Sequence, residues 1–152
     1  MERRLTEERI TRTMLAWLKG KDWIIVTYDY PQSGTGYSLL SANRDSGSKN
    51  NGVIIPDIVA VRNGAVLFFE NKVQFSMVDV EAIQLLRDTH LYDASISLLL
   101  REYEPINKIR FGFALKNSPS NLKKLTENRP AFDFAFLVNQ ELGVDLAFGQ
   151  LS

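Results

Sequence analysis

The chain has no cysteine and only one histidine, His90, among its 152 residues. The first absence excludes a disulfide framework and a thiolate zinc site. The second excludes any metal centre that needs two histidines. No apolar run approaches the roughly 20 residues that span a bilayer, and the polar N-terminus does not resemble a signal peptide. We therefore expect a cytoplasmic protein with no membrane partner.

The chain also lacks an excess of charge of either sign. Eighteen basic and 18 acidic residues cancel, whereas a nucleic-acid-binding protein often carries a basic excess. The balance argues mildly against tight non-specific binding to DNA, although a local basic patch could still contact phosphates. The length, together with the absence of repeats and linkers, predicts a single domain over residues 1–152.

Hydrophobic periodicity predicts an α/β fold. Apolar residues at helical spacing indicate a helix over residues 5–19, and alternating residues indicate a strand over residues 109–115. The same criteria predict further helices over residues 78–91, 93–102 and 120–128, and further strands over residues 23–30, 53–61, 65–72, 132–138 and 144–148. The strand–helix–strand run over residues 109–138 implies a parallel pair. We expect a mixed β-sheet with helices on both faces.

Residues 31–52 form a long segment rich in Ser, Gly and Asn, interrupted by a short element around residues 37–40. Loops of this length are uncommon in compact domains and are often functional or disordered.

A tight hairpin joins the strands predicted over residues 53–61 and 65–72. Asn-Gly between apolar runs favours a type I′ turn, so Asn63 and Gly64 fix the register. In that register Asp57 lies directly opposite Glu70, and Lys72 projects to the same face. Because the flanking residues are apolar, both carboxylates should be buried, where they must share a proton, pair with a cation or bind a metal. A hard ion such as Mg²⁺ prefers oxygen ligands of this kind.

Pro56 is the exception in this pattern. Proline removes a hydrogen-bond donor from the ladder and is expected at strand edges or bulges. We therefore expect the first strand to bend just before Asp57, which could shift the register by one residue.

The motif resembles that of the PD-(D/E)xK nuclease superfamily. Pro56-Asp57 is followed after twelve residues by Glu70-Asn71-Lys72, and the predicted order of helices and strands is similar over most of the chain. The resemblance implies a restriction-endonuclease-like sheet with an αβββαβ core. It also implies a Mg²⁺-dependent endonuclease that hydrolyses phosphodiester bonds of DNA, with Mn²⁺ expected to substitute.

The resemblance assigns roles to individual residues. Asp57 and Glu70 would bind the metal together with the backbone carbonyl of Asn71, and Lys72 would orient or activate the attacking water. Many members also use a glutamate from the first helix, and Glu7, on the apolar stripe of that helix, would be this further catalytic residue and metal ligand. The alternative is that Glu7 only interacts with the dipole of the first helical turn.

Three further residues are candidates for contact with nucleic acid. Arg44 and Lys49 lie in the long polar segment, and Gln84 lies on the helix after the motif. A solvated loop and a solvent-facing glutamine explain them as well.

Several alternatives stay open. Within the nuclease class, the chain could be a restriction-type enzyme or a Holliday-junction-resolving or repair nuclease. Outside it, the chain could be a non-catalytic nucleic-acid-binding or scaffold subunit, or an unrelated α/β domain in which Lys72 only neutralises the carboxylates. The expected substrate is double-stranded DNA, cut by a homodimer or by a subunit of a larger nuclease.

Overall fold

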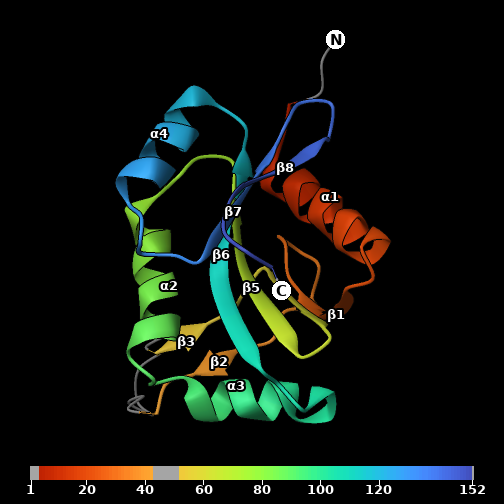
Figure 1. Cartoon of the computed structure of the whole chain (residues 1–152), viewed down its shortest axis with the longest axis vertical. Coiled ribbons are helices and arrows are strands. Elements are labelled where there is room, and N and C mark those ends of the chain that lie inside the picture. The colour runs from red at the N-terminus through yellow and green to blue at the C-terminus, as the bar shows by residue number, and fades with distance from the viewer. Residues whose placement is uncertain (1–3, 43–51, 152) are drawn as a thin grey trace.

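The computed structural model describes residues 4–42 and 52–151, and in this part of the chain two sheets form (Figure 1). The main sheet has six strands in the order β1-β4-β5-β6-β7-β8. These strands are β1 (Ile24–Tyr28), β4 (Ile58–Arg62), β5 (Ala65–Lys72), β6 (Lys108–Lys116), β7 (Phe134–Val138) and β8 (Val144–Phe148). The β5–β6 and β6–β7 pairs are parallel, and the other three pairs are antiparallel. The small second sheet pairs β2 (Leu39–Leu40) with β3 (Val53–Ile54).

Helices cover both faces of the main sheet, as expected from the sequence. They are α1 (Glu7–Gly20), α2 (Met77–Asp88), α3 (Asp93–Leu100) and α4 (Pro119–Glu127), with a 3-10 turn at Arg101–Tyr103. Hydroxyl side chains cap three of them: Thr6, Ser76 and Ser118 accept hydrogen bonds from backbone N–H groups of the first turn. The mixed α/β class is therefore confirmed.

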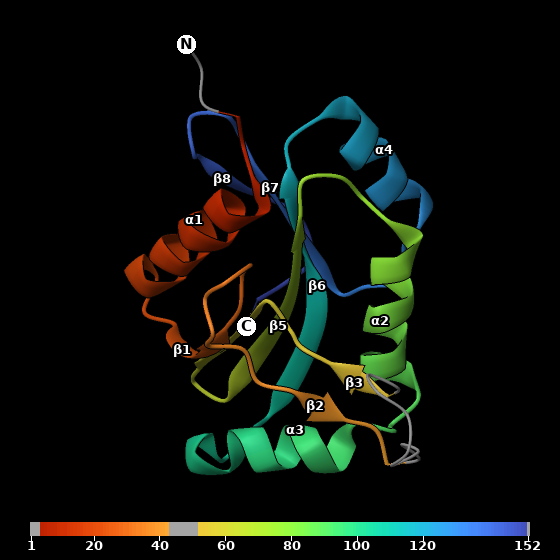
Figure 2. The ribbon, with the colours of Figure 1, turned by 180° about the vertical axis from the view of Figure 1, so that it is seen from behind.

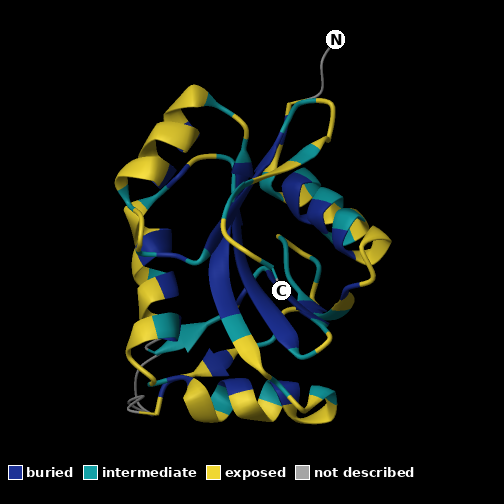
Figure 3. Cartoon of the chain, in the orientation of Figure 1, coloured by how far each residue is buried: buried dark blue, intermediate teal, exposed yellow. Residues whose placement is uncertain are grey.

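The sheet separates two apolar layers. On one face Ile10 and Met14 of α1 pack in a layer with Phe69 of β5. On the other face Val80 and Ile83 of α2 lie in a layer that also holds side chains from α3 and α4. Figure 3 shows the consequence, because the central strands are buried while the outer sides of the helices are exposed. None of the helices in the described residues is long and apolar enough to cross a membrane.

The β4–β5 hairpin has the predicted turn and register. Asn63 and Gly64 adopt φ angles of 50° and 82°, the positive values that a type I′ turn requires. Arg62 pairs with Ala65, and the ladder continues in step to Ile58 and Phe69.

The prediction of a single strand over residues 53–61 is wrong. The chain breaks at residues 55–57, so that β3 joins the small sheet and β4 joins the main one. Pro56 has no N–H for a ladder at this point. Asp57 therefore precedes β4, and its N–H donates to the carbonyl of Phe69 at 3.0 Å, so Asp57 is not the ladder partner of Glu70.

Because the chain joins the main sheet only at Ile58, β4 is shorter than its partner β5. Residues 70–72 of β5 pair with β6 on one side but have no β4 partner on the other. Backbone groups and side chains on that side of β5 are therefore available for contacts other than a sheet ladder.

Candidate active site

The predicted motif residues lie at the C-terminal end of β5, where β4 no longer pairs with it. The first turns of two helices approach this end, α1 from one face and α2 from the other (Figures 1 and 2). Asp57 comes from the bend before β4, and Glu70 and Lys72 come from β5. The structure therefore brings the three motif residues together, although the sequence predicted only a bend at Pro56 and not a break between two strands.

Asp57 is held in place by backbone groups. Its Oδ2 accepts a hydrogen bond from the N–H of Asn71 at 2.7 Å, and its carbonyl accepts one from the N–H of Asp29 at 2.8 Å. Burial raises the pKa of Asp57 to about 7, although the hydrogen bond from Asn71 and the charge of Lys72 oppose the rise. A carboxyl group in this state binds a proton readily near neutral pH unless a cation replaces it.

Glu70 is the most deeply buried acid of the motif, with 9% of its surface exposed. Alternation along β5 places its side chain on the same face as Val66 and Phe68, which pack in the layer of α2. Burial raises its pKa well above the usual value, and the nearby charges of Asp57 and Asp79 add to the rise. Glu70 thus also needs a proton or a cation.

Lys72 forms an ion pair with Glu7 of α1, with 3.1 Å between Nζ and Oε1. Burial lowers the pKa of Lys72, but the hydrogen bond with Glu7 and the surrounding carboxylates together raise it above the usual value. Glu7 therefore reaches the motif and does more than interact with the helix dipole. Glu8, by contrast, is exposed and pairs with Arg12 at 3.3 Å.

Asn71 connects the motif to α1. Its side-chain Nδ2 donates to Thr11 Oγ1 at 3.1 Å, and that hydroxyl donates to the carbonyl of Glu7 at 3.0 Å. The N–H and C=O of one strand residue point to the same side, so the carbonyl of Asn71 points, like its N–H, past the end of β4. The carbonyl therefore points to the side on which Asp57 lies.

Asp79 belongs to the same cluster but was missed from the sequence. It lies in the first turn of α2, and it interacts electrostatically with Lys72, Glu7 and Glu70. Burial raises its pKa. The only signal in the sequence was an acid three residues after Ser76, a spacing that is also typical of an ordinary helix N-terminus.

Of the three residues predicted to contact nucleic acid, only Gln84 lies in the described part of the chain. Gln84 is exposed on α2 and, within the described residues, makes no hydrogen bond to the motif. Arg44 and Lys49 lie outside the described residues. A cavity of about 610 Å³ does open beside the motif, lined by Glu7, Lys72 and their neighbours Arg4, Leu5, Thr6, Val73 and Gln74.

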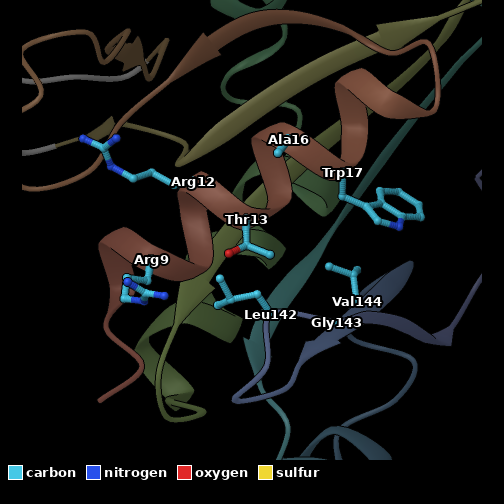
Figure 4. Close-up of a pocket in the computed structure, with 8 residues that line it drawn as sticks. All are labelled: Arg9, Arg12, Thr13, Ala16, Trp17, Leu142, Gly143 and Val144. Atoms are coloured by element: carbon cyan, nitrogen blue, oxygen red, sulfur yellow. The ribbon is translucent and has the colours of Figure 1, made fainter. Parts of the chain in front are cut away.

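A second groove, of about 740 Å³, runs along α1 on its outer side (Figure 4). Arg9, Arg12 and Trp17 line it from the helix, while Leu142 lines it from the turn before β8 and Val144 from the start of β8. None of the motif carboxylates reaches this groove, so it is separate from the candidate active site.

The oxygen ligands at this site fit a divalent cation that keeps several of its waters better than one coordinated entirely by protein groups. In the described part of the chain, no three Asp, Glu or His side chains converge closely enough to hold a metal by themselves. Mg²⁺ usually keeps several waters and uses one or two protein carboxylates plus substrate phosphate. Asp57, Glu70 and the carbonyl of Asn71 supply this smaller set of hard oxygen ligands.

Comparisons with protein-family models and with curated protein sequences find no match for this chain.

Proposed function

We propose that this protein is a Mg²⁺-dependent endonuclease that hydrolyses phosphodiester bonds of DNA, with a restriction-endonuclease-like fold. One observation carries the proposal. Buried Glu70 and partly buried Asp57 are two carboxyl groups at the end of one strand pair, and the cation beside them, Lys72, is already paired with Glu7 at 3.1 Å. Buried carboxylates without a counter-ion are costly, and a divalent cation removes that cost.

The topology supports the same proposal. Helix α1 precedes the antiparallel strands β1, β4 and β5, and the parallel strand β6 follows after α2 and α3. This order is similar to that of the αβββαβ core implied by the resemblance, with Asp57 just before the second of the three strands and Glu70 and Lys72 on the third. The small β2–β3 sheet is an insertion between the first two of these strands.

Asp57, Glu70 and the carbonyl of Asn71 would hold the metal. A bound Mg²⁺ or Mn²⁺ would polarise the scissile phosphate and lower the pKa of the attacking water. The hydrogen bond from the Asn71 N–H fixes one oxygen of Asp57 and leaves the other available. The protein thus sets the position of this ligand before the metal arrives.

Lys72 acts as a cation in this proposal. Because its pKa is raised, the amine stays protonated at neutral pH and cannot accept a proton from water. A protonated lysine beside the metal ligands can instead orient the water and stabilise the negative charge that develops on the phosphate. Of the two roles expected from the sequence, orientation is therefore favoured over activation by proton abstraction.

Double-stranded DNA is the proposed substrate. The cavity beside Lys72 offers Arg4 and Gln74, both exposed, for contact with phosphates next to the scissile bond. We propose that the chain acts as a homodimer or with a larger nuclease subunit.

The proposal is tested with supercoiled plasmid, incubated with the protein in Mg²⁺, in Mn²⁺ and in EDTA. We expect nicked and linear products in either metal and none in EDTA. Lys72→Ala should lower the cleavage rate at least about 100-fold, since it removes charge stabilisation in the transition state. Lys123→Ala is the control, because Lys123 is exposed on α4 and forms its ion pair with Glu127 on the same helix. Absence of cleavage by the wild-type protein in both metals would overturn the proposal.

A further inference from the structure

Strand β8 lies at one end of the main sheet, where it pairs with β7 alone among the described strands. Its residues are exposed or half-buried, whereas the central strands are buried (Figure 3). The outer edge of such a strand presents N–H and C=O groups to which a second strand can add. We propose that β8 pairs antiparallel with β8 of a second copy of this chain. The inference names the interface of the homodimer in the proposed function, on which it rests.

The opposite end of the sheet is covered in part by the chain itself. The segment after β1 folds back on that strand: the Thr35 hydroxyl donates to the carbonyl of Tyr28 at 2.7 Å, and the Thr35 carbonyl accepts from the hydroxyl of Thr27 at 3.2 Å. Within residues 4–42 and 52–151, the backbone of β8 makes its hydrogen bonds to β7 and to no further segment. β8 is therefore the edge that is open to a partner.

Leu146 gives the proposed interface an apolar centre. It is the middle residue of β8 and is 43% exposed. It pairs with Phe136 of β7, whose side chain packs in the layer of α1, so Leu146 points to that same face of the sheet. In an antiparallel pair centred on this residue, Leu146 lies directly opposite Leu146 of the partner subunit, and each leucine covers the other. The contact removes apolar surface from water in both chains.

Two charged side chains lie on the other face of the same edge. Asp145 pairs with Leu137 and therefore points to the face of α2, where Phe148 also packs. Arg129 lies over the ring of Phe148, with its Cζ 4.2 Å from the ring centroid. Asp145 and Arg129 are both exposed, and neither forms an ion pair with another described residue.

The antiparallel pair brings these opposite charges together. With Leu146 opposite itself, Asp145 lies opposite Ala147 of the partner subunit, next to the partner's Phe148 and hence close to the partner's Arg129. A two-fold interface repeats every contact, so two such ion pairs form, one on each side of the axis. This charge complementarity favours a second copy as the occupant, because an unrelated strand gives no reason for an acid and an arginine at these two positions.

Sedimentation velocity of the full chain in EDTA tests the interface. We expect the wild-type protein to be a dimer. Leu146→Lys places a charge at the centre of the pair and should give a monomer. Leu98→Lys is the matched control, because Leu98 is 54% exposed on α3, and this variant should remain a dimer. Circular dichroism of each variant checks that the fold is kept.

Charge reversal tests the register of the pair. Asp145→Arg and Arg129→Asp should each weaken the dimer at least about 10-fold, because each change places like charges side by side. The protein that carries both changes should recover most of the lost affinity. A double variant that binds as weakly as the single ones would overturn the pairing centred on Leu146. This set decides the question even if Leu146→Lys does not fold.

The outcomes separate the inference from the proposed function. A monomeric wild-type protein would overturn the inference and leave the edge of β8 to a strand of a different protein. A dimeric Leu146→Lys or a monomeric Leu98→Lys would overturn it as well. Plasmid cleavage is measured separately: a dimer that cuts no DNA would overturn the proposed function and support the interface, whereas a monomer that cuts DNA would overturn the interface alone.

Discussion

The carboxylate of Asp57 accepts a 2.7 Å hydrogen bond from the backbone N–H of Asn71, at the place where β4 stops pairing with β5. A side chain thus takes the place of a backbone partner in the ladder. The bend at Pro56 makes this possible, since it moves the backbone out of the ladder and brings the side chain in. The same bend leaves the end of β5 open to the carboxylates around it.

Asp57→Asn should stabilise the metal-free protein at alkaline pH. The pKa of Asp57 is about 7 in the folded protein and 3.8 in the unfolded chain, so the fold favours the protonated form. The stability from this group is complete below pH 3.8 and is lost as the pH rises through about 7. Asparagine keeps an oxygen that can accept from Asn71 but has no charge to bury. At pH 8 in EDTA we expect a gain on the order of 1–4 kcal/mol in the free energy of unfolding.

The measurement is urea denaturation of both proteins in EDTA at pH 5 and at pH 8. The wild-type protein should lose stability between these two values, and the variant should lose less. Equal losses in the two proteins would show that Asp57 is ionised without cost in the fold.

Glu7→Gln should slow cleavage without unfolding the protein. The change breaks the ion pair with Lys72, whose two side chains are each 35% exposed, so the stability should change by less than about 1 kcal/mol. Lys72 would lose the partner that positions its ammonium group, and we expect a cleavage rate about 10- to 100-fold lower. Single-turnover kinetics with DNA in Mg²⁺ give this rate.

Glu8→Gln is the control for this prediction. Glu8 is the next residue on α1 and its ion pair, with Arg12, lies on the exposed side of the helix. Its loss should leave the cleavage rate unchanged, and an equal effect of both variants would contradict a specific role of Glu7.

Asn121→Ala should destabilise the link between β5 and α2. The buried side chain of Asn121 accepts from the N–H of Phe75 at 3.0 Å and donates to the carbonyls of Val73 and Lys116 at 2.9 and 2.8 Å. Alanine leaves these three backbone groups without partners, which costs roughly 2–4 kcal/mol. Asn128→Ala removes one hydrogen bond near the end of α4 and should cost less than about 1 kcal/mol.

Thermal denaturation of the two variants tests this prediction. The melting temperature of Asn121→Ala should fall by about 5–10 °C, well below that of Asn128→Ala. Similar melting temperatures would show that the segment between β5 and α2 holds its place without Asn121.

The sequence was sufficient to predict the hairpin, because local chemistry decides it. Asn63 and Gly64 adopt the positive φ angles of a two-residue turn, and this turn sets every pair up to Ile58 and Phe69. The break at Pro56 was expected only as a bend. Whether a bent strand continues or joins another sheet depends on the partner that it meets, here β2, and the sequence near Pro56 contains no information on that partner.

The acidic cluster, too, could be predicted from the sequence only in part. Asp57, Glu70 and Lys72 were predicted from one hairpin, where sequence spacing becomes spatial proximity. Asp79 reaches the cluster because α2 packs on the sheet through Val80 and Ile83 at a particular angle. That angle depends on contacts with α3, α4 and β6, which a spacing in the sequence does not specify.

The most direct test of the account is the cleavage of duplex DNA by purified wild-type protein and by Glu70→Gln, measured across a titration of Mg²⁺. Glutamine matches the shape of Glu70 but supplies no charge for a metal. The account predicts cleavage that requires Mg²⁺ and a rate at least about 100-fold lower for the variant, with its fold intact by circular dichroism. Equal cleavage by the two proteins, or cleavage that persists in EDTA, would contradict a metal centre at the end of β5.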